Sequence, residues 1–159
     1  MKKILFLAVF AAISLSVSAQ REYDAQKSFT HEVGLYFQDG WGFGYQLRKE
    51  FNPYFGWNII GVSYMSCLNG SPADYGQVNI KLLGARAYTP SYRWIRGYAD
   101  LNVGYTIKYG WNTKEPSHYL GLDFGVGLQV HKRFAVGYNL NYLGPEKIKE
   151  HWAKFSFLF

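Results

Sequence analysis

Residues 118–132, "HYLGLDFGVGLQVHK", carry the clearest two-residue repeat in the chain. Large apolar side chains occupy every second position, and small or polar side chains fill the positions between them. The first set is Leu120, Leu122, Phe124, Val126, Leu128 and Val130, and the second is Gly121, Asp123, Gly125, Gly127 and Gln129. Strict alternation over this length predicts a β-strand with two chemically different faces.

The same alternation recurs along the chain and predicts eight strands in all. They lie near residues 31–38, 41–51, 54–65, 75–88, 92–109, 119–131, 134–143 and 151–159. Most of these segments are long enough to cross a bilayer as tilted strands, which takes roughly 9–11 residues. After the first 20 residues, no stretch approaches the roughly 18 consecutive apolar residues of a membrane-spanning helix.

The orientation of the two faces decides the class of barrel. A soluble antiparallel barrel places its apolar face inside. Here the apolar face is bulky and rich in Tyr and Phe, whereas the opposite face is Gly, Asn, Asp, Thr and Lys. Large side chains suit lipid, and small or charged ones suit a narrow polar interior. We therefore predict an all-β, eight-stranded, antiparallel up-and-down transmembrane β-barrel, with a soluble periplasmic ligand-binding barrel as the less favoured alternative.

Two segments break the alternation. In 54–65, Phe55 and Trp57 share one parity while Ile60 and Val62 share the other, which predicts a bulge near Gly61. In 75–88, the apolar face of the first half would carry Arg86 outward. Either Arg86 lies at the membrane edge, or the register shifts at Gly84, and the residues do not choose between these.

The connections alternate in length, and this sets the topology. Tight turns are predicted at 52–53, 89–91 and 132–133, as on the periplasmic side of such barrels. The other connections are 39–40, 66–74, 110–118 and 144–151. Three of these four are longer and more polar, so we expect them to face outside.

The start of the chain has the features of an export signal. Lys2 and Lys3 precede an apolar core and a small-residue site ending at Ala19, which predicts a cleaved signal peptide at 1–19. A short periplasmic tail (20–30) and a barrel domain (31–159) would follow. Cys67 is the only cysteine, so no intrachain disulfide forms. The formal charge of +6 is not gathered in one run, and we expect no nucleic-acid partner.

The last predicted strand, "HWAKFSFLF" (151–159), ends on Phe with apolar residues at alternate positions. In this C-terminal strand and in its overall pattern of alternating strands, the chain resembles the small eight-stranded outer-membrane β-barrels of Gram-negative bacteria, the OmpA-like and OmpX-like proteins. The resemblance implies the bacterial outer membrane, a monomer surrounded by outer-membrane lipids, and delivery by periplasmic chaperones. It also implies that the barrel-assembly machinery recognises the positions Ala153, Phe155, Phe157 and Phe159.

Ionisable residues on the predicted inner face should pair, because a lone buried charge is costly. They are Glu32, Arg48, Lys81, Asp100, Lys108, Asp123 and Lys154. An eight-stranded barrel is only wide enough for its own side chains. We therefore expect a salt-bridge network that plugs the interior, and a structural or surface-interaction role.

Other kinds of site have weaker support. The histidines His31, His118, His131 and His151 lack the spacing of a zinc site, and we expect no metal and no cofactor. The alternative function is a lipid A-modifying acyl enzyme. No His-x-Ser pair occurs, and a loose set would be Ser66, Ser71, Asp74, Ser117 and His118. We therefore expect no catalytic residues.

Aromatic residues near the strand ends are predicted to form girdles at the two membrane interfaces. They are Trp41, Trp57, Tyr88, Trp94, Tyr109, Trp111, Tyr119, Tyr142 and Trp152. The alternative for Trp111 is stacking against a carbohydrate.

Overall fold

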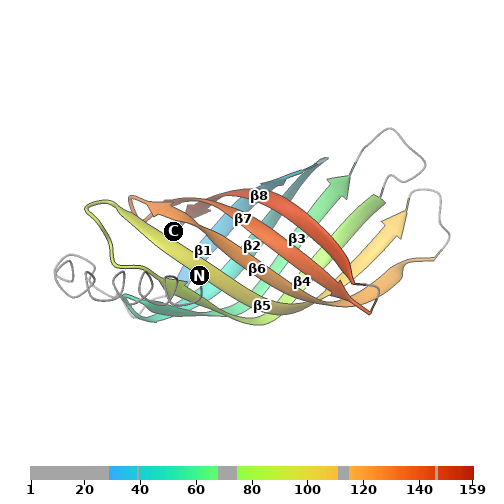
Figure 1. The fold of residues 1–159 in the computed structure, drawn as a ribbon, viewed down its shortest axis with the longest axis horizontal. Coiled ribbons are helices and arrows are strands. Elements are labelled where there is room, and N and C mark those ends of the chain that lie inside the picture. The colour runs from blue at the N-terminus through green and yellow to red at the C-terminus, as the bar shows by residue number, and fades with distance from the viewer. Residues whose placement is uncertain (1–28, 39, 68–74, 111–114, 146) are drawn as a thin grey trace, which may run out of the picture.

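The computed structural model describes residues 29–38, 40–67, 75–110, 115–145 and 147–159. They form one closed barrel in which each strand pairs with the next and β8 pairs with β1 (Figure 1). The strands are β1 (Phe29–Phe37), β2 (Gly40–Asn52), β3 (Phe55–Cys67), β4 (Tyr75–Tyr88), β5 (Ile95–Gly110), β6 (Ser117–Val130), β7 (Phe134–Gly144) and β8 (Ile148–Leu158). All pairs are antiparallel, which confirms the predicted eight-stranded up-and-down barrel.

No helix in the described part of the chain is long and apolar enough to cross a membrane.

Strand boundaries differ from the prediction by at most three residues. β1 begins at Phe29, two residues earlier than expected. β5 begins at Ile95 rather than residue 92, because Tyr92 and Ile95 bond to each other across the preceding turn. β8 begins at Ile148 rather than residue 151, so residues 148–151 of the predicted 144–151 connection belong to this strand. The predicted signal peptide 1–19, the tail as far as residue 28, and connection residues 68–74 and 111–114 lie outside the described residues.

The strand order places the connections at two opposite ends of the barrel (Figure 1). The β2–β3, β4–β5 and β6–β7 turns share one end, here named the turn end. The remaining four connections share the other, here named the loop end. β1 and β8 also meet near the turn end, where the His31 and Phe159 backbones exchange hydrogen bonds of 2.8 and 2.9 Å.

Two bulges, one in β3 and one in β4, account for the two breaks in the alternation of the sequence. Leu47 pairs with Ile60 but Arg48 pairs with Asn58, so Ile59 is the extra residue in β3. This bulge lies two residues from the predicted one at Gly61. In β4 a second register shift leaves Leu82 unpaired with β5, and both Leu82 and Leu83 point outward. The shift lies at Leu82 rather than Gly84, and it turns Arg86 into the interior.

The two faces of the wall have opposite chemistry. On β8, Phe155 and Phe157 are 47% and 39% exposed, whereas Lys154 and Ser156 between them are buried. Every strand carries at least one large apolar side chain on the outside: Val33, Phe43, Val62, Leu82, Leu101, Leu122, Val136 and Phe155. A water-soluble barrel has the reverse arrangement, so the soluble ligand-binding alternative is wrong. This outer surface matches a protein surrounded by lipid.

The predicted aromatic girdles are partly wrong. Tyr88, Tyr119 and Trp152 point into the barrel and are buried. Each shares the parity of an inward-facing neighbour, as Trp152 does with Lys154, and parity decides the face. Trp41, Trp57 and Trp94 are exposed as expected. Tyr109 and Tyr142 are half-buried, and Trp111 lies outside the described residues.

Candidate functional site

The barrel interior is organised around the carboxylate of Glu32 on β1. Three cations from three other strands bind it. Arg86 Nη1 lies 2.9 Å from Oε2, Lys154 Nζ lies 2.5 Å from Oε1, and Arg48 also pairs with Oε2. All four side chains are at most 1% exposed. A buried carboxylate is stable only with such compensation.

Arg86 also binds a second carboxylate, that of Asp100 on β5. Two parallel hydrogen bonds of 2.5 Å join Nε to Oδ1 and Nη2 to Oδ2. This forked geometry is specific to arginine, because lysine has no planar pair of donors. Asn58 on β3 adds a donor to Asp100 at 3.4 Å. We name Glu32, Arg48, Arg86, Asp100 and Lys154 the central cluster.

A second group of charges extends the central cluster toward the turn end. Tyr88 accepts a hydrogen bond from Arg48 and donates one of 2.8 Å to Glu50. Arg96 Nη2 lies 3.5 Å from Glu50, and its guanidinium lies 3.5 Å from the centre of the Tyr88 ring. Together, the central cluster and this second group contain four cations and three carboxylates. The cations are Arg48, Arg86, Arg96 and Lys154, and the carboxylates are Glu32, Glu50 and Asp100. The π-face of Tyr88 offsets part of the excess positive charge.

Two further ion pairs lie toward the loop end. Lys81 Nζ is 2.9 Å from Asp123 Oδ1, and Asn139 donates to the same carboxylate at 3.1 Å. Lys108 pairs with Glu150 close to the loops. Each carboxylate also accepts at least one amide hydrogen bond, so its oxygens are satisfied from more than one strand.

Apolar layers flank the central cluster on both sides. The layer toward the loop end is Tyr36, Met65 and Trp152. The layer toward the turn end is Tyr88, Tyr98, Ala135 and Leu158. Gly127 and Gly137, which pair with each other, leave the space that the Tyr98 ring fills. The central cluster therefore sits between two apolar layers.

The structure places all seven predicted network residues on the inner face, and each makes an ion pair. Four of them meet in the central cluster: Glu32, Arg48, Asp100 and Lys154. Lys81 pairs with Asp123, and Lys108 pairs with Glu150 outside the central cluster. Sequence reasoning missed four charged members: Glu50, Arg86, Arg96 and Glu150. Arg86 follows the bulge. Each of the other three shares the parity of a predicted network residue on its own strand, so the alternation could have identified it from the sequence.

The predicted assembly positions lie together on the outer face of the last strand. Ala153, Phe155 and Phe157 are exposed on β8, and Phe159 follows directly after it and is 64% exposed. Phe159 stacks on His31 of β1 with ring centres 5.5 Å apart. The row is therefore accessible from the lipid side at the seam that closes the barrel.

Among the described members of the loose catalytic set, Ser66 lies apart from Ser117 and His118. Ser66 is buried inside the barrel, whereas Ser117 and His118 are exposed. The His118 ring stacks on Tyr105 at 5.8 Å. Ser71 and Asp74 lie outside the described residues. Among the described residues, no group of three His, Cys, Asp or Glu side chains could hold a metal ion.

Comparison with known proteins gives a fold but no relative in sequence. No protein-family model and no curated protein sequence matches the chain. Solved structures do match. The N-terminal β-barrel domain of Pseudomonas aeruginosa OprF superposes with a TM-score of 0.56 at 15% identity, covering 86% of this chain and 100% of that one. The chain has the fold of the small eight-stranded outer-membrane β-barrels.

Two further outer-membrane barrels have the same fold. Neisserial surface protein A gives a TM-score of 0.56 at 10% identity and covers 82% of this chain and 90% of its own. The outer membrane enzyme PagL gives 0.50 at 13% identity, covering 82% and 97%. The fold and the apolar outer surface together indicate a protein of the bacterial outer membrane.

Proposed function

We propose that the protein is a sealed outer-membrane barrel with a structural or surface-interaction role, and that it is neither an open channel nor an enzyme. The observation that carries this proposal is the filled interior. Two apolar layers enclose the central cluster. An interior cavity beside Lys81 and Asp123 measures about 10 Å³, which is room for about one water molecule.

An ion crossing this interior would have to separate charges that already satisfy one another. Glu32 and Asp100 are each held by arginine at 2.9 Å or less. A passing ion would also lose its hydration shell at the layer formed by Tyr36, Met65 and Trp152. Both costs raise the barrier to conduction.

Conductance in planar lipid bilayers tests the sealed interior. The wild-type barrel is expected to give no sustained channels. Trp152→Ala removes the largest side chain of the loop-side layer and should increase brief openings. Trp41→Ala removes a tryptophan from the outer face and serves as the control, with no expected effect. Long-lived channels in the wild type would refute the sealed barrel.

The placement of two of the candidate polar residues supports the proposal that the protein is not an enzyme. Ser66 faces the interior and His118 faces outward, so these two candidates lie on opposite faces of the wall. A serine nucleophile needs a base within hydrogen-bonding reach and a group that orients the base. Incubating the refolded protein with lipid A should release or transfer no acyl chains. Turnover that disappears in His118→Ala would reverse this assignment.

Assembly by the barrel-assembly machinery after escort by periplasmic chaperones is part of the same proposal. Ala153, Phe155, Phe157 and Phe159 support it, because they form one exposed apolar row at the closing seam. The interior pairs join strands that are distant in sequence, so the network stabilises the closed barrel only after all eight strands are present.

A further inference from the structure

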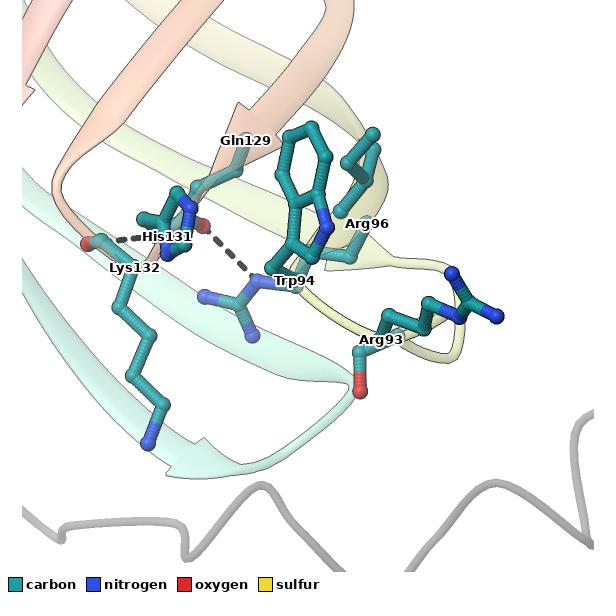
Figure 2. Close-up of a pocket in the computed structure, with 8 residues that line it drawn as sticks. Arg93, Trp94, Arg96, Gln129, His131 and Lys132 are labelled. Atoms are coloured by element: carbon teal, nitrogen blue, oxygen red, sulfur yellow. Dashed lines mark hydrogen bonds between the residues drawn. The ribbon is translucent and has the colours of Figure 1, made fainter.

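A cavity of about 420 Å³ lies at the turn end, between the β4–β5 and β6–β7 turns. Figure 2 shows the side chains around it. Its walls carry Arg93, Trp94, Arg96, Gln129, His131 and Lys132. Among the described residues that line it there is no Asp or Glu. The cavity is therefore a basic pocket at the turn end of the barrel, and its Arg96 also belongs to the interior charge group.

Hydrogen bonds hold the walls of this pocket in place. The Arg96 side chain donates from Nε to Gln129 at 2.8 Å and from Nη1 to the Pro53 carbonyl at 3.3 Å. Gln129 in turn donates to the Lys132 carbonyl at 2.8 Å. Glu50 lies 3.5 Å from Arg96 on the interior side and offsets part of its charge. The side chains of Arg93 and Lys132 are exposed.

The two turns also contact each other through aromatic rings. Trp94 and His131 are stacked with ring centres 5.0 Å apart and an interplanar angle of 11°. The His131 amide donates to the Trp94 carbonyl at 2.8 Å. The pocket is thus preformed, with one flat aromatic wall and several basic side chains.

The backbone at this pocket adds an independent observation. Four non-glycine residues in the described chain have a positive φ, and three of them line the cavity: Arg93 (55°), His131 (51°) and Lys132 (61°). Glycine or asparagine is the usual choice at such positions, because an L side chain crowds the backbone there. The backbone of these turns therefore fixes the positions from which three basic side chains extend beside the cavity.

The position of the pocket selects the partner. Tyr92 and Trp94 beside it are 76% and 50% exposed, as aromatic residues are at a membrane interface. Lipid phosphates lie at that depth, and basic pockets at an interface bind acidic headgroups. We propose that this pocket binds the phosphodiester headgroup of an anionic phospholipid of the phosphatidylglycerol class. A zwitterionic headgroup fits less well, because its ammonium group would face the same cations. The proposal does not depend on whether the lumen conducts.

Native mass spectrometry of the full chain refolded in neutral detergent tests this proposal. Phosphatidylglycerol, phosphatidylcholine and inorganic phosphate are added separately. The wild type should retain phosphatidylglycerol in preference to phosphatidylcholine. The double variant Arg93→Gly/Lys132→Gly should lose this preference by on the order of 10- to 30-fold, from about fivefold per cation. Glycine suits both backbone positions, so the variant should keep its fold, which unboiled gel migration checks.

Lys147→Gly is the matched control, because Lys147 is also a basic residue with a positive φ (59°) but lies at the loop end. It should retain phosphatidylglycerol like the wild type. Equal retention of the two lipids by the wild type would overturn the proposal. So would an equal loss in Lys147→Gly. Binding of inorganic phosphate without any lipid preference would assign the pocket to a free anion instead and would also overturn it.

Discussion

Arg86 on β4 lies directly opposite Asp100 on β5, and two hydrogen bonds of 2.5 Å join the guanidinium to the carboxylate. Both side chains are at most 1% exposed. The same arginine also binds Glu32 across the barrel. One side chain therefore links three strands, and it does so only because the bulge at Leu82 turns it inward.

Arg86→Met should lower the free energy of unfolding by about 3–5 kcal/mol, because it leaves two buried carboxylates short of a cation. Urea unfolding of the barrel refolded in lipid vesicles measures this. Lys149→Met, at an exposed position, is the control and should change stability by less than about 0.5 kcal/mol.

The double variant Arg86→Met/Asp100→Leu refines the same test. It removes both partners of the pair and should recover part of the lost stability, since apolar replacements of a buried ion pair are often nearly neutral. If the single and double variants are equally destabilised, the loss comes from packing rather than from an uncompensated carboxylate.

The glycines of the inner face should differ in their tolerance of a methyl group. At Gly127 an added Cβ would lie 2.7 Å from the Gly137 Cα and 2.7 Å from the Tyr98 ring. At Gly34 the nearest atoms are Lys154 Cε and Ser156 Oγ, both at 3.3 Å. Gly127→Ala should therefore cost about 1–3 kcal/mol in the same unfolding assay. Gly34→Ala should cost clearly less, and equal costs would contradict this description of the packing.

Alternation alone carries most of the fold, as β6 and β7 illustrate. It fails where a bulge adds a residue, because the parity of Arg86 depends on how β4 pairs with β5, and pairing is not a property of one strand. The girdle prediction for Trp152 failed for a different reason. Its parity with Lys154 places it inside, but its size and its position near a strand end suggested a girdle. Which charges meet, such as Lys108 with Glu150, follows from the barrel register and not from spacing in the chain.

Phe159→Ala should reduce assembly in cells more than refolding in vitro. The substitution removes an exposed ring from the closing seam but leaves the backbone hydrogen bonds between residues 159 and 31 in place. Phe29→Ala removes an exposed ring from β1, whose first residue it is, and is the control. Outer-membrane fractions and refolding yields, both scored by heat-modifiable gel migration, give the comparison. A similar assembly defect in both variants would argue against a special role for Phe159.

Trp41 and Trp152 lie on opposite faces of the barrel wall and can report which face contacts lipid. Phe37 pairs with Trp41 on one side and with Ala153, the neighbour of Trp152, on the other, so the two rings lie at similar depth. Trp41 is 51% exposed on the outer face, whereas Trp152 is 1% exposed inside. Variants that retain one of these tryptophans, with the others replaced by Phe, can be placed in vesicles of lipids brominated along the acyl chain.

Bromine on the acyl chains quenches tryptophan fluorescence on contact. Trp41 should be strongly quenched relative to vesicles without bromine, and Trp152 should be nearly unaffected. Quenching of Trp152 as strong as that of Trp41, or no quenching of Trp41, would contradict a barrel with an apolar surface in lipid and a sealed, ion-paired interior.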